Sequence, residues 1–170
     1  MENKLDLRVK IKILRKSLDI VRISGVITKN IMTHPVFVQA SDIMIYYPLK
    51  YEINLLKLID LAPNKNFYFP KVDGEKLLVC PNCNDFEKSD MNIFEPCSNP
   101  VSPEILDLVI VPALAVDEEH FRLGYGGGFY DKFLAQNNNI KTLTPICKDF
   151  IYKSLPKENF DRQIDFIVSD

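Results

Sequence analysis

The sequence predicts an α/β protein, a single-domain layered sandwich in which helices flank a mostly parallel central sheet. Two observations support this class. Short apolar segments typical of buried strands alternate with helical patterns along the chain. The length of 170 residues, with 46% hydrophobic and 26% charged residues, suits one globular domain with its own core. Residues 1–170 are therefore expected to form one domain.

The N-terminal half begins with a helical pattern. Apolar residues recur at three- to four-residue steps and predict one amphipathic helix; they are Leu7, Ile11, Leu14, Leu18 and Val21. The other expected elements are a strand over 42–47, a helix over 52–61, and strands over 66–69 and 77–80 around an Asp73-Gly74 turn.

The C-terminal half begins with a segment of little periodicity. Residues 80–103 contain four prolines and are expected to form a long loop. The elements expected after it are a strand over 106–112, a helix that starts at Phe129, a strand over 140–144, a short helix over 150–155 and a closing strand over 164–168.

Glycine is concentrated in one segment. Four of the six glycines lie between Gly124 and Gly128, in Arg122-Leu-Gly-Tyr-Gly-Gly-Gly-Phe-Tyr-Asp131. Glycine there lets the backbone approach a ligand closely, and a helix N-terminus favours phosphate. The segment lacks the Gly-Lys-Ser/Thr ending of a Walker A motif, and Phe129 replaces the last glycine of a dinucleotide fingerprint. The pattern therefore predicts a phosphate site of another kind.

Charged residues flank the glycine segment. Arg122 supplies a cation before it, and Asp131 supplies a carboxylate after it. This combination suggests a triphosphate with Mg2+, although Asp131 would also favour a helix start without any ligand. Further cations, Lys4, Arg8, Lys12 and Arg15, recur on the first helix. They form either a solvated face or a contact with the far end of a nucleotide.

Composition excludes several classes of protein. The net charge of −2 argues against nucleic acid or an anionic membrane as the main partner. The charged N-terminus is unlike a signal peptide, and the longest apolar run is too short for a membrane span, so a cytoplasmic protein is expected. Cys80 and Cys83 have C-x2-C spacing with Cys97 nearby. A zinc site would need a fourth ligand from His120 or Cys147, so reduced thiols are the default.

The glycine segment and Val111-Pro-Ala-Leu-Ala-Val-Asp117 closely resemble the 5-formyltetrahydrofolate cyclo-ligase family, also called methenyltetrahydrofolate synthetases. Weaker resemblances follow in the family's order along nearly the whole chain. They are Lys4-Leu-Asp-Leu-Arg8, Glu52-Ile53, Phe69-Pro-Lys-Val72, Asn92-Ile-Phe-Glu-Pro96, Leu155-Pro156 and Asp161 through Asp165.

The resemblance implies ATP- and Mg2+-dependent ring closure of 5-formyltetrahydrofolate to 5,10-methenyltetrahydrofolate, with release of ADP and phosphate. By resemblance, Arg122 and Tyr130 are catalytic, Tyr47 and Glu52 bind the folate, and Asp131 and Asp161 hold Mg2+. The residues implied for ATP are Lys4, Arg8, Arg122, Leu123, Gly124, Tyr125, Gly126, Gly127, Gly128, Phe129 and Tyr130.

Several of these residues also have structural interpretations. Glu52 would suit a helix start, Asp161 a terminal turn, and Tyr47 the core. Departures from the family pattern at His120, Val116, Asn92, Phe150 and Gly127 leave a changed substrate open. The alternatives to the enzyme are a non-catalytic folate- or nucleotide-binding protein and a zinc-stabilised interaction domain. The expected partners are a reduced folate and ATP, without nucleic acid or membrane; the sequence does not decide oligomeric state, and a monomer is the default.

Overall fold

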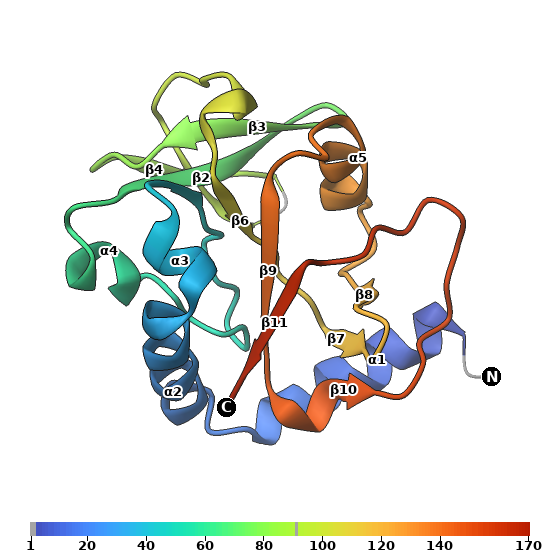
Figure 1. The fold of residues 1–170 in the computed structure, drawn as a ribbon. Helices are drawn as coiled ribbons and strands as arrows, with labels where there is room; N and C mark the ends of the chain where they lie inside the picture. Colours follow the sequence, from blue (N-terminus) through green and yellow to red (C-terminus); the bar gives the residue numbers. More distant parts are fainter. Residues whose placement is uncertain (1–2, 91) are drawn as a thin grey trace.

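The computed structural model describes residues 3–90 and 92–170 (Figure 1). Its helices are α1 (Lys4–Leu14), α2 (Ile20–Thr33), α3 (Pro35–Gln39), α4 (Lys57–Leu61) and α5 (Phe129–Gln136), with 3-10 turns η1 (Arg15–Ser17), η2 (Pro103–Ile105) and η3 (Lys148–Phe150). Its strands are β1 (Asp42–Met44), β2 (Asn66–Asp73), β3 (Lys76–Pro81), β4 (Phe86–Lys88), β5 (Phe94–Pro96), β6 (Leu108–Ile110), β7 (Ala115–Asp117), β8 (Arg122–Leu123), β9 (Lys141–Ile146), β10 (Ile151–Tyr152) and β11 (Phe166–Ser169).

A six-stranded sheet forms the centre, in the order β11-β9-β6-β1-β2-β3. Neighbouring strands are parallel except for β2 and β3, which form an antiparallel hairpin. The predicted α/β fold with a mostly parallel sheet is confirmed. The order reverses between β1 and β6, because β2 follows on one side and β9 on the other. Crevices at the carboxyl ends of strands at such a point are the usual ligand sites of α/β proteins.

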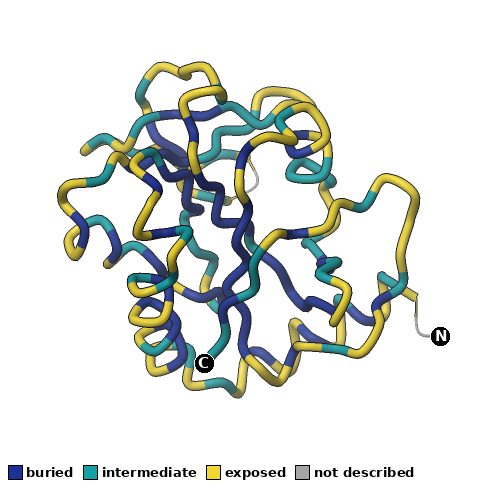
Figure 2. Tube along the Cα trace, viewed as in Figure 1, coloured by how far each residue is buried: buried dark blue, intermediate teal, exposed yellow. Residues whose placement is uncertain are grey.

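Side chains alternate between the two faces of the sheet, as the two-residue period of a strand requires. Ile43 and Ile45 belong to the core that α1, α2 and α3 cover, whereas Met44 belongs to the core that α5 covers. Likewise, Leu108 belongs to the core under α1, α2 and α3, and Val109 belongs to the core under α5. The result is three layers, helix, sheet and helix. Figure 2 shows the central strands buried and the connecting loops exposed.

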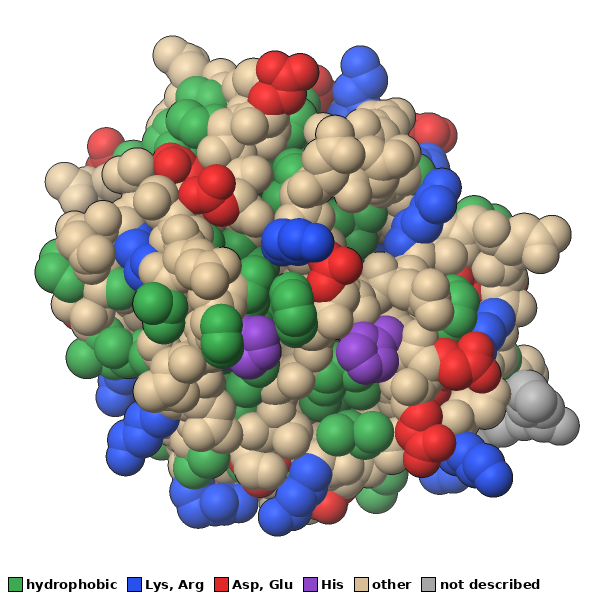
Figure 3. Space-filling view, viewed as in Figure 1, with side chains coloured by type: hydrophobic (Ala, Val, Ile, Leu, Met, Phe, Trp, Pro, Cys, Tyr) green, Lys and Arg blue, Asp and Glu red, His purple; other side chains and the backbone are tan. Residues whose placement is uncertain are grey.

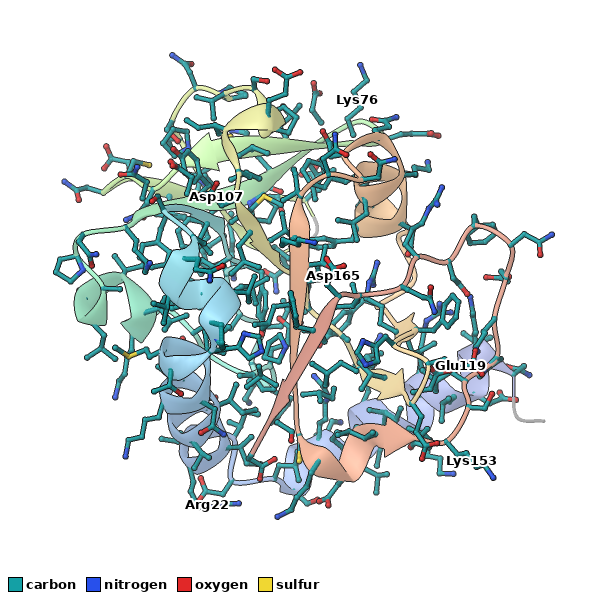
Figure 4. All side chains as sticks on the ribbon, in the orientation of Figure 1. Arg22, Lys76, Asp107, Glu119, Lys153 and Asp165 are labelled. Atoms are coloured by element: carbon teal, nitrogen blue, oxygen red, sulfur yellow. The ribbon has the colours of Figure 1, made fainter. Side chains whose placement is uncertain are left out.

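Two aspartates, labelled in Figure 4, fix the starts of strands. Asp107 accepts hydrogen bonds from the backbone N–H groups of Ser41 and Asp42, at 2.7 and 3.1 Å, and so ties β6 to β1. Asp165 accepts from the backbone N–H and the hydroxyl of Thr142, at 2.8 and 3.0 Å, and ties β11 to β9. Anchored starts bring the carboxyl ends of these strands to one edge of the sheet.

The predicted helical stripe from Leu7 to Val21 is confirmed only at Leu7 and Ile11, which are buried on α1, and it fails from Leu14, which is 45% exposed. There the first helix ends, and Asp19 caps a separate helix, α2, by accepting a hydrogen bond from the Arg22 N–H at 3.1 Å. Val21 is 80% exposed rather than buried. The sequence interpretation also missed α2 and α3 themselves.

Three further expectations are corrected. The helix over 52–61 shortens to α4, because the Asn54 side chain accepts a hydrogen bond from the Leu56 N–H at 3.0 Å and holds the chain in a turn. The segment 80–103 is not only loop, since it contains the β4–β5 hairpin. The helix over 150–155 is replaced by η3 and by β10, which pairs with β7.

None of the helices that the structure describes is long and apolar enough to cross a lipid bilayer. On the face drawn in Figure 3, acidic and basic side chains are interspersed, in line with the net charge of −2.

Candidate active site

A cavity of about 750 Å³ lies where the residues after β1 and β6 meet α1, the glycine segment and the C-terminal loop. Its volume is in the range of small-molecule sites. Every residue to which the sequence assigns a site role lines this cavity: Lys4, Arg8, Tyr47, Glu52, Arg122, Leu123, Gly124, Tyr125, Gly126, Gly127, Gly128, Phe129, Tyr130, Asp131 and Asp161. The fold therefore brings together residues that are up to 157 positions apart in the chain.

The glycine segment connects β8 to α5. The chain does not enter it directly from the buried strand β6, as the sequence suggested, but through the β7–β8 hairpin. Gly126 and Gly128 have φ values of +113° and +68°, which L side chains rarely adopt. Gly128 is the N-cap of α5, so the free N–H groups of the first helical turn adjoin the cavity. Free N–H groups at a helix start are suited to an anionic ligand.

Arg8 holds the glycine segment against α1. Its Nε donates a hydrogen bond to the Gly124 carbonyl oxygen at 2.9 Å. A Cβ added at Gly126 would lie 3.7 Å from the Arg8 guanidinium. The cationic face of the first helix is thus partly turned toward the cavity rather than wholly solvated.

Arg122 and Asp131 form a shielded ion pair beside the glycine segment. The Arg122 Nη2 lies 3.1 Å from the Asp131 Oδ1, and the Arg122 side chain is only 5% exposed. Burial lowers the pKa of the Arg122 guanidinium, and the negative charge of Asp131 opposes this shift. Arginine nevertheless remains protonated at neutral pH. Asp131 therefore pairs with the Arg122 guanidinium in addition to favouring the start of α5.

Tyr130 completes this group. Its ring centre lies 5.7 Å from the Arg122 guanidinium carbon. Burial, followed by the charge of Glu52, raises the pKa of the Tyr130 hydroxyl, so it stays a neutral donor. Within the described residues, neither this hydroxyl nor the Arg122 Nε has a hydrogen-bond partner, although both atoms are buried. Unpartnered buried donors beside a cavity are suited to a ligand oxygen.

Lys4 and Asp161 pair across the mouth of the cavity. The Lys4 Nζ lies 2.8 and 2.6 Å from the two Asp161 carboxylate oxygens, and 2.6 Å from the Glu158 Oε2. Asp161 also accepts a hydrogen bond from the Glu158 N–H at 2.7 Å. It therefore fixes a terminal turn and faces the cavity at the same time.

Asp131 and Asp161 are the only carboxylates that the sequence assigns to a metal. Among the described residues, no group of three or more His, Cys, Asp or Glu side chains could hold a metal ion. Mg2+ does not require such a group, because one or two carboxylates, phosphate oxygens and water commonly complete its shell. Both aspartates line the cavity with the glycine segment, so the donor set fits Mg2+ brought with a nucleotide.

We call the part of the cavity formed by these groups the charged end; it comprises Lys4, Arg8, Arg122, Asp131, Asp161 and residues 124–128. A second part of the cavity, the aromatic end, comprises Tyr47, Glu52 and Phe94, with Phe69 and Phe86 packed against Tyr47. The ring centre of Tyr47 lies 4.9 Å from that of Phe94 and 5.6 Å from that of Phe86. Such a wall suits a flat, partly apolar ligand.

Glu52 supplies a carboxylate at the aromatic end. It lies in a bend rather than at a helix start, and its Oε2 accepts a hydrogen bond from the Leu49 N–H at 2.7 Å. Burial raises the pKa of Glu52, while the Leu49 N–H, the Tyr125 hydroxyl and the Arg15 charge oppose the rise. The polar groups around it thus support the charged form of a buried carboxylate.

Comparisons with known proteins agree with this geometry. The model of the 5-formyltetrahydrofolate cyclo-ligase family matches residues 1–170. The chain belongs to this family. The 5-formyltetrahydrofolate cyclo-ligase of Haemophilus influenzae is 32% identical over 138 residues, which cover 72% of each protein. The 5,10-methenyltetrahydrofolate synthetase of Aquifex aeolicus has 28% identity and a TM-score of 0.84, covering 97% of this chain and 88% of that one.

A second solved structure supports the fold. The 5,10-methenyltetrahydrofolate synthetase of Mycoplasma pneumoniae superposes with a TM-score of 0.80 at 19% identity, over 99% of both chains. These relatives and the family match identify the chain as an enzyme of the cyclo-ligase family.

Sequence reasoning missed the buried position of Arg15, which contacts the cavity residue Tyr125 in this cyclo-ligase family member. It was placed on a cationic face, but it is 4% exposed and donates to the carbonyl oxygens of Ala113 and Leu114, the latter at 3.1 Å. Its Nη1 donates to the Tyr125 hydroxyl at 3.2 Å. A signal was present, because Arg15 follows the buried Leu7 and Ile11 at four-residue steps.

Sequence reasoning also gave no role to Phe94, although Phe94 lines the cavity. Its segment was recognised only as part of the family pattern. Its contact with Tyr47 depends on the β4–β5 hairpin, which local sequence did not predict.

The cysteines of this family member are all free thiols. Cys80 and Cys147 are buried, Cys83 is half-buried and Cys97 is exposed. Because the described residues contain no metal-binding group of three or more such ligands, the zinc-stabilised alternative has no support. That the thiols are reduced stays a prediction.

Proposed function

We propose that this protein catalyses the ATP- and Mg2+-dependent cyclisation of 5-formyltetrahydrofolate to 5,10-methenyltetrahydrofolate, with release of ADP and phosphate. The observation that carries the proposal is the single cavity that joins a glycine segment with flanking ion pairs to an aromatic wall with a buried carboxylate. The family match names the same substrate.

The chemistry requires activation of a formamide. Its carbonyl carbon is a poor electrophile, so the formyl oxygen first takes the γ-phosphoryl group of ATP. N10 of the same folate then attacks the activated carbon, and phosphate leaves. Phosphoryl transfer depends mainly on alignment and on stabilisation of charge, and little on acid–base groups.

The charged end supplies the groups for this step. The backbone N–H groups of residues 124–128 and the first turn of α5 would hold the phosphates. Arg122 would offset the charge that develops on the transferred phosphoryl group. The Tyr130 hydroxyl and the Arg122 Nε, which are buried and without partners among the described residues, would gain acceptors from a bound phosphate.

Asp131 and Asp161 would hold Mg2+, which supplies charge neutralisation on the phosphate oxygens when bound. Their present partners, Arg122 and Lys4, are then free to contact phosphate instead. Lys4 and Arg8 reach the cavity from α1 and would bind the nucleotide. Each cation is already positioned before ligand arrives.

The aromatic end would hold the folate. The Tyr47 and Phe94 rings offer a surface for the pterin, and Glu52 would accept hydrogen bonds from pterin N–H groups. This arrangement would place the formyl group between the aromatic wall and the glycine segment.

A direct assay tests the proposal. Pure protein mixed with 5-formyltetrahydrofolate and MgATP should generate the near-ultraviolet absorbance of the methenyl product, with one ADP released per product. Chelation of Mg2+ should stop both signals. A folded protein that binds ATP but produces neither signal would overturn the proposal. Thermal stabilisation by the ligands without ADP release would instead indicate a binding protein.

A further inference from the structure

Two cysteines outside the cavity, Cys83 and Cys97, each donate a hydrogen bond to the same backbone carbonyl oxygen. The Cys83 thiol donates a hydrogen bond to the Asp85 carbonyl oxygen at 2.9 Å, and the Cys97 N–H donates to the same oxygen at 3.0 Å. The hairpin register explains this meeting. Phe86 pairs with Pro96 in the β4–β5 ladder, so Asp85 and Cys97 are the next positions outward. Cys83 and Cys97 therefore lie together at the base of the hairpin.

The two thiols have unequal surroundings. Desolvation raises the pKa of the Cys83 thiol, but hydrogen bonding to the backbone of Asp85, Ser98 and Cys97 outweighs this effect, so the pKa is lowered. The pKa of Cys97 is raised, first by desolvation and next by the charge of Glu87. Cys83 is thus the better attacking thiolate, and Cys97, which is exposed, lies where it can resolve a mixed disulfide.

No role already assigned accounts for this arrangement. Neither cysteine lines the cavity, and cyclisation of a folate needs no thiol. The described residues offer no metal-binding group that would include the pair. The third cysteine of the motif, Cys80, is buried on β3.

We propose that Cys83 and Cys97 form a dithiol site that low-molecular-weight disulfides oxidise. The Cys83 thiolate attacks one sulfur of the oxidant, such as oxidised glutathione, and one glutathione thiolate leaves. The Cys97 thiolate then attacks the Cys83 sulfur of the mixed disulfide, and the second glutathione leaves. The two cysteine protons end on the two released thiols, and the oxidant takes the two electrons.

The crosslink would tie together the two ends of the segment that contains β4 and β5. This segment includes Phe94, which forms part of the aromatic end. The site is therefore separate from the cavity but adjoins one of its walls.

Intact-mass measurement and peptide mapping after treatment with oxidised glutathione test the proposal. The wild-type protein should lose two hydrogens, retain no glutathione and yield a Cys83–Cys97 linked peptide. Cys97→Ser should instead keep one glutathione on Cys83. Cys147→Ala, which changes a buried thiol elsewhere, should behave as the wild type.

Reaction rates provide a second test. Cys97→Ser, which retains Cys83, should react with a chromogenic disulfide at least about tenfold faster than Cys83→Ser, which retains Cys97. A stable glutathione adduct on the wild-type protein, or a crosslink that involves Cys80, would overturn the proposal. Because the wild-type mass and peptide map decide the pairing by themselves, the test stands even if one variant does not fold.

Discussion

The two ends of the cavity are built in different ways. The charged end depends on pairs between distant segments, such as Lys4 with Asp161 and Arg8 with Gly124. The aromatic end depends on ring contacts of Tyr47, which follows β1, with Phe69 of β2 and with the β4–β5 hairpin, and on the buried carboxylate of Glu52. Loss of a group at the charged end leaves a charge unpaired, whereas loss of a ring leaves mainly a smaller contact surface. Substitutions at the charged end should therefore have the larger effects and act on ATP, whereas substitutions at the aromatic end should have smaller effects and act on the folate.

The largest effect is expected for Asp131→Ala. This change removes a proposed Mg2+ ligand and leaves the Arg122 guanidinium buried without its partner. We expect kcat to fall by about a thousandfold or more. Asp131→Asn, which keeps the shape but not the charge, should show nearly the same loss and a weaker response to added Mg2+. A kcat within threefold of wild type in a folded variant would contradict a role for Asp131 in the charged end.

Gly126→Val tests the backbone of the glycine segment. The φ of +113° disfavours valine, so the backbone should shift beside the Arg8 guanidinium, which a Cβ at this position would touch in ordinary van der Waals contact at 3.7 Å. We expect the KM for ATP to rise by about tenfold or more, with a smaller change for the folate. Gly25→Ala, at a helical position with open space around it, is the matched control. An unchanged KM for ATP would count against the phosphate cradle.

Lys4→Ala should act on the same ligand more weakly. Its ammonium lies at the mouth of the cavity and pairs with a carboxylate that also has a backbone donor. We expect about a tenfold higher KM for ATP and a smaller change in kcat. Lys16→Ala removes an exposed lysine outside the cavity and should leave both constants unchanged. Equal behaviour of the two variants would place Lys4 among the structural residues.

These tests rest on residues that the sequence identified with unequal success. The glycine segment of the charged end, with Arg122 and Asp131, could be listed from sequence because its residues are continuous in the chain, whereas Lys4, Arg8 and Asp161 were named from the family resemblance. Even so, the pairing of Lys4 with Asp161 could not be foreseen, since it depends on how α1 meets the C-terminal loop. Tertiary placement, rather than residue type, was the missing information.

Some secondary-structure elements could likewise be predicted from the sequence, whereas others could not. The β2–β3 hairpin was predictable, because its strands flank Gly74 in a left-handed conformation that suits the turn. The break between α1 and α2 was not, because apolar spacing continued across the capping residue Asp19. Arg15 was expected either on a solvated face or against a nucleotide, because its charge suggested exposure or a ligand, although backbone carbonyls satisfy that charge inside the protein.

Phe94→Ala tests the aromatic end. It removes the ring 4.9 Å from Tyr47 while leaving the ion pairs of the charged end untouched. We expect the KM for the folate to rise by about five- to tenfold, and the KM for ATP to stay constant. A rise in both constants would mean that the two ends do not act independently. The KM for ATP is thus the internal control.

The smallest effect is expected at the point where the two ends touch. Tyr125 belongs to the glycine segment, accepts a hydrogen bond from Arg15 at 3.2 Å and donates one to Glu52. That donation helps to hold down the pKa of Glu52, which burial raises above its ordinary value. Tyr125→Phe removes the donor, so the pKa of Glu52 should rise further.

The sign of the resulting pH effect follows from protonation. If the folate binds to the Glu52 carboxylate, activity falls as pH drops through the pKa of Glu52, and Tyr125→Phe should move this acid limb to higher pH. At pH well above the limb, kcat/KM for the folate should return to within about twofold to threefold of wild type. Folded Glu52 binds protons more tightly than the unfolded side chain, so stability should also fall more steeply with rising pH in the variant. Profiles of kcat/KM against pH measure the shift. An acid limb that stays at the wild-type pH would show that the Tyr125 hydroxyl does not influence the pKa of Glu52. The two ends of the cavity would then not be linked through this hydrogen bond.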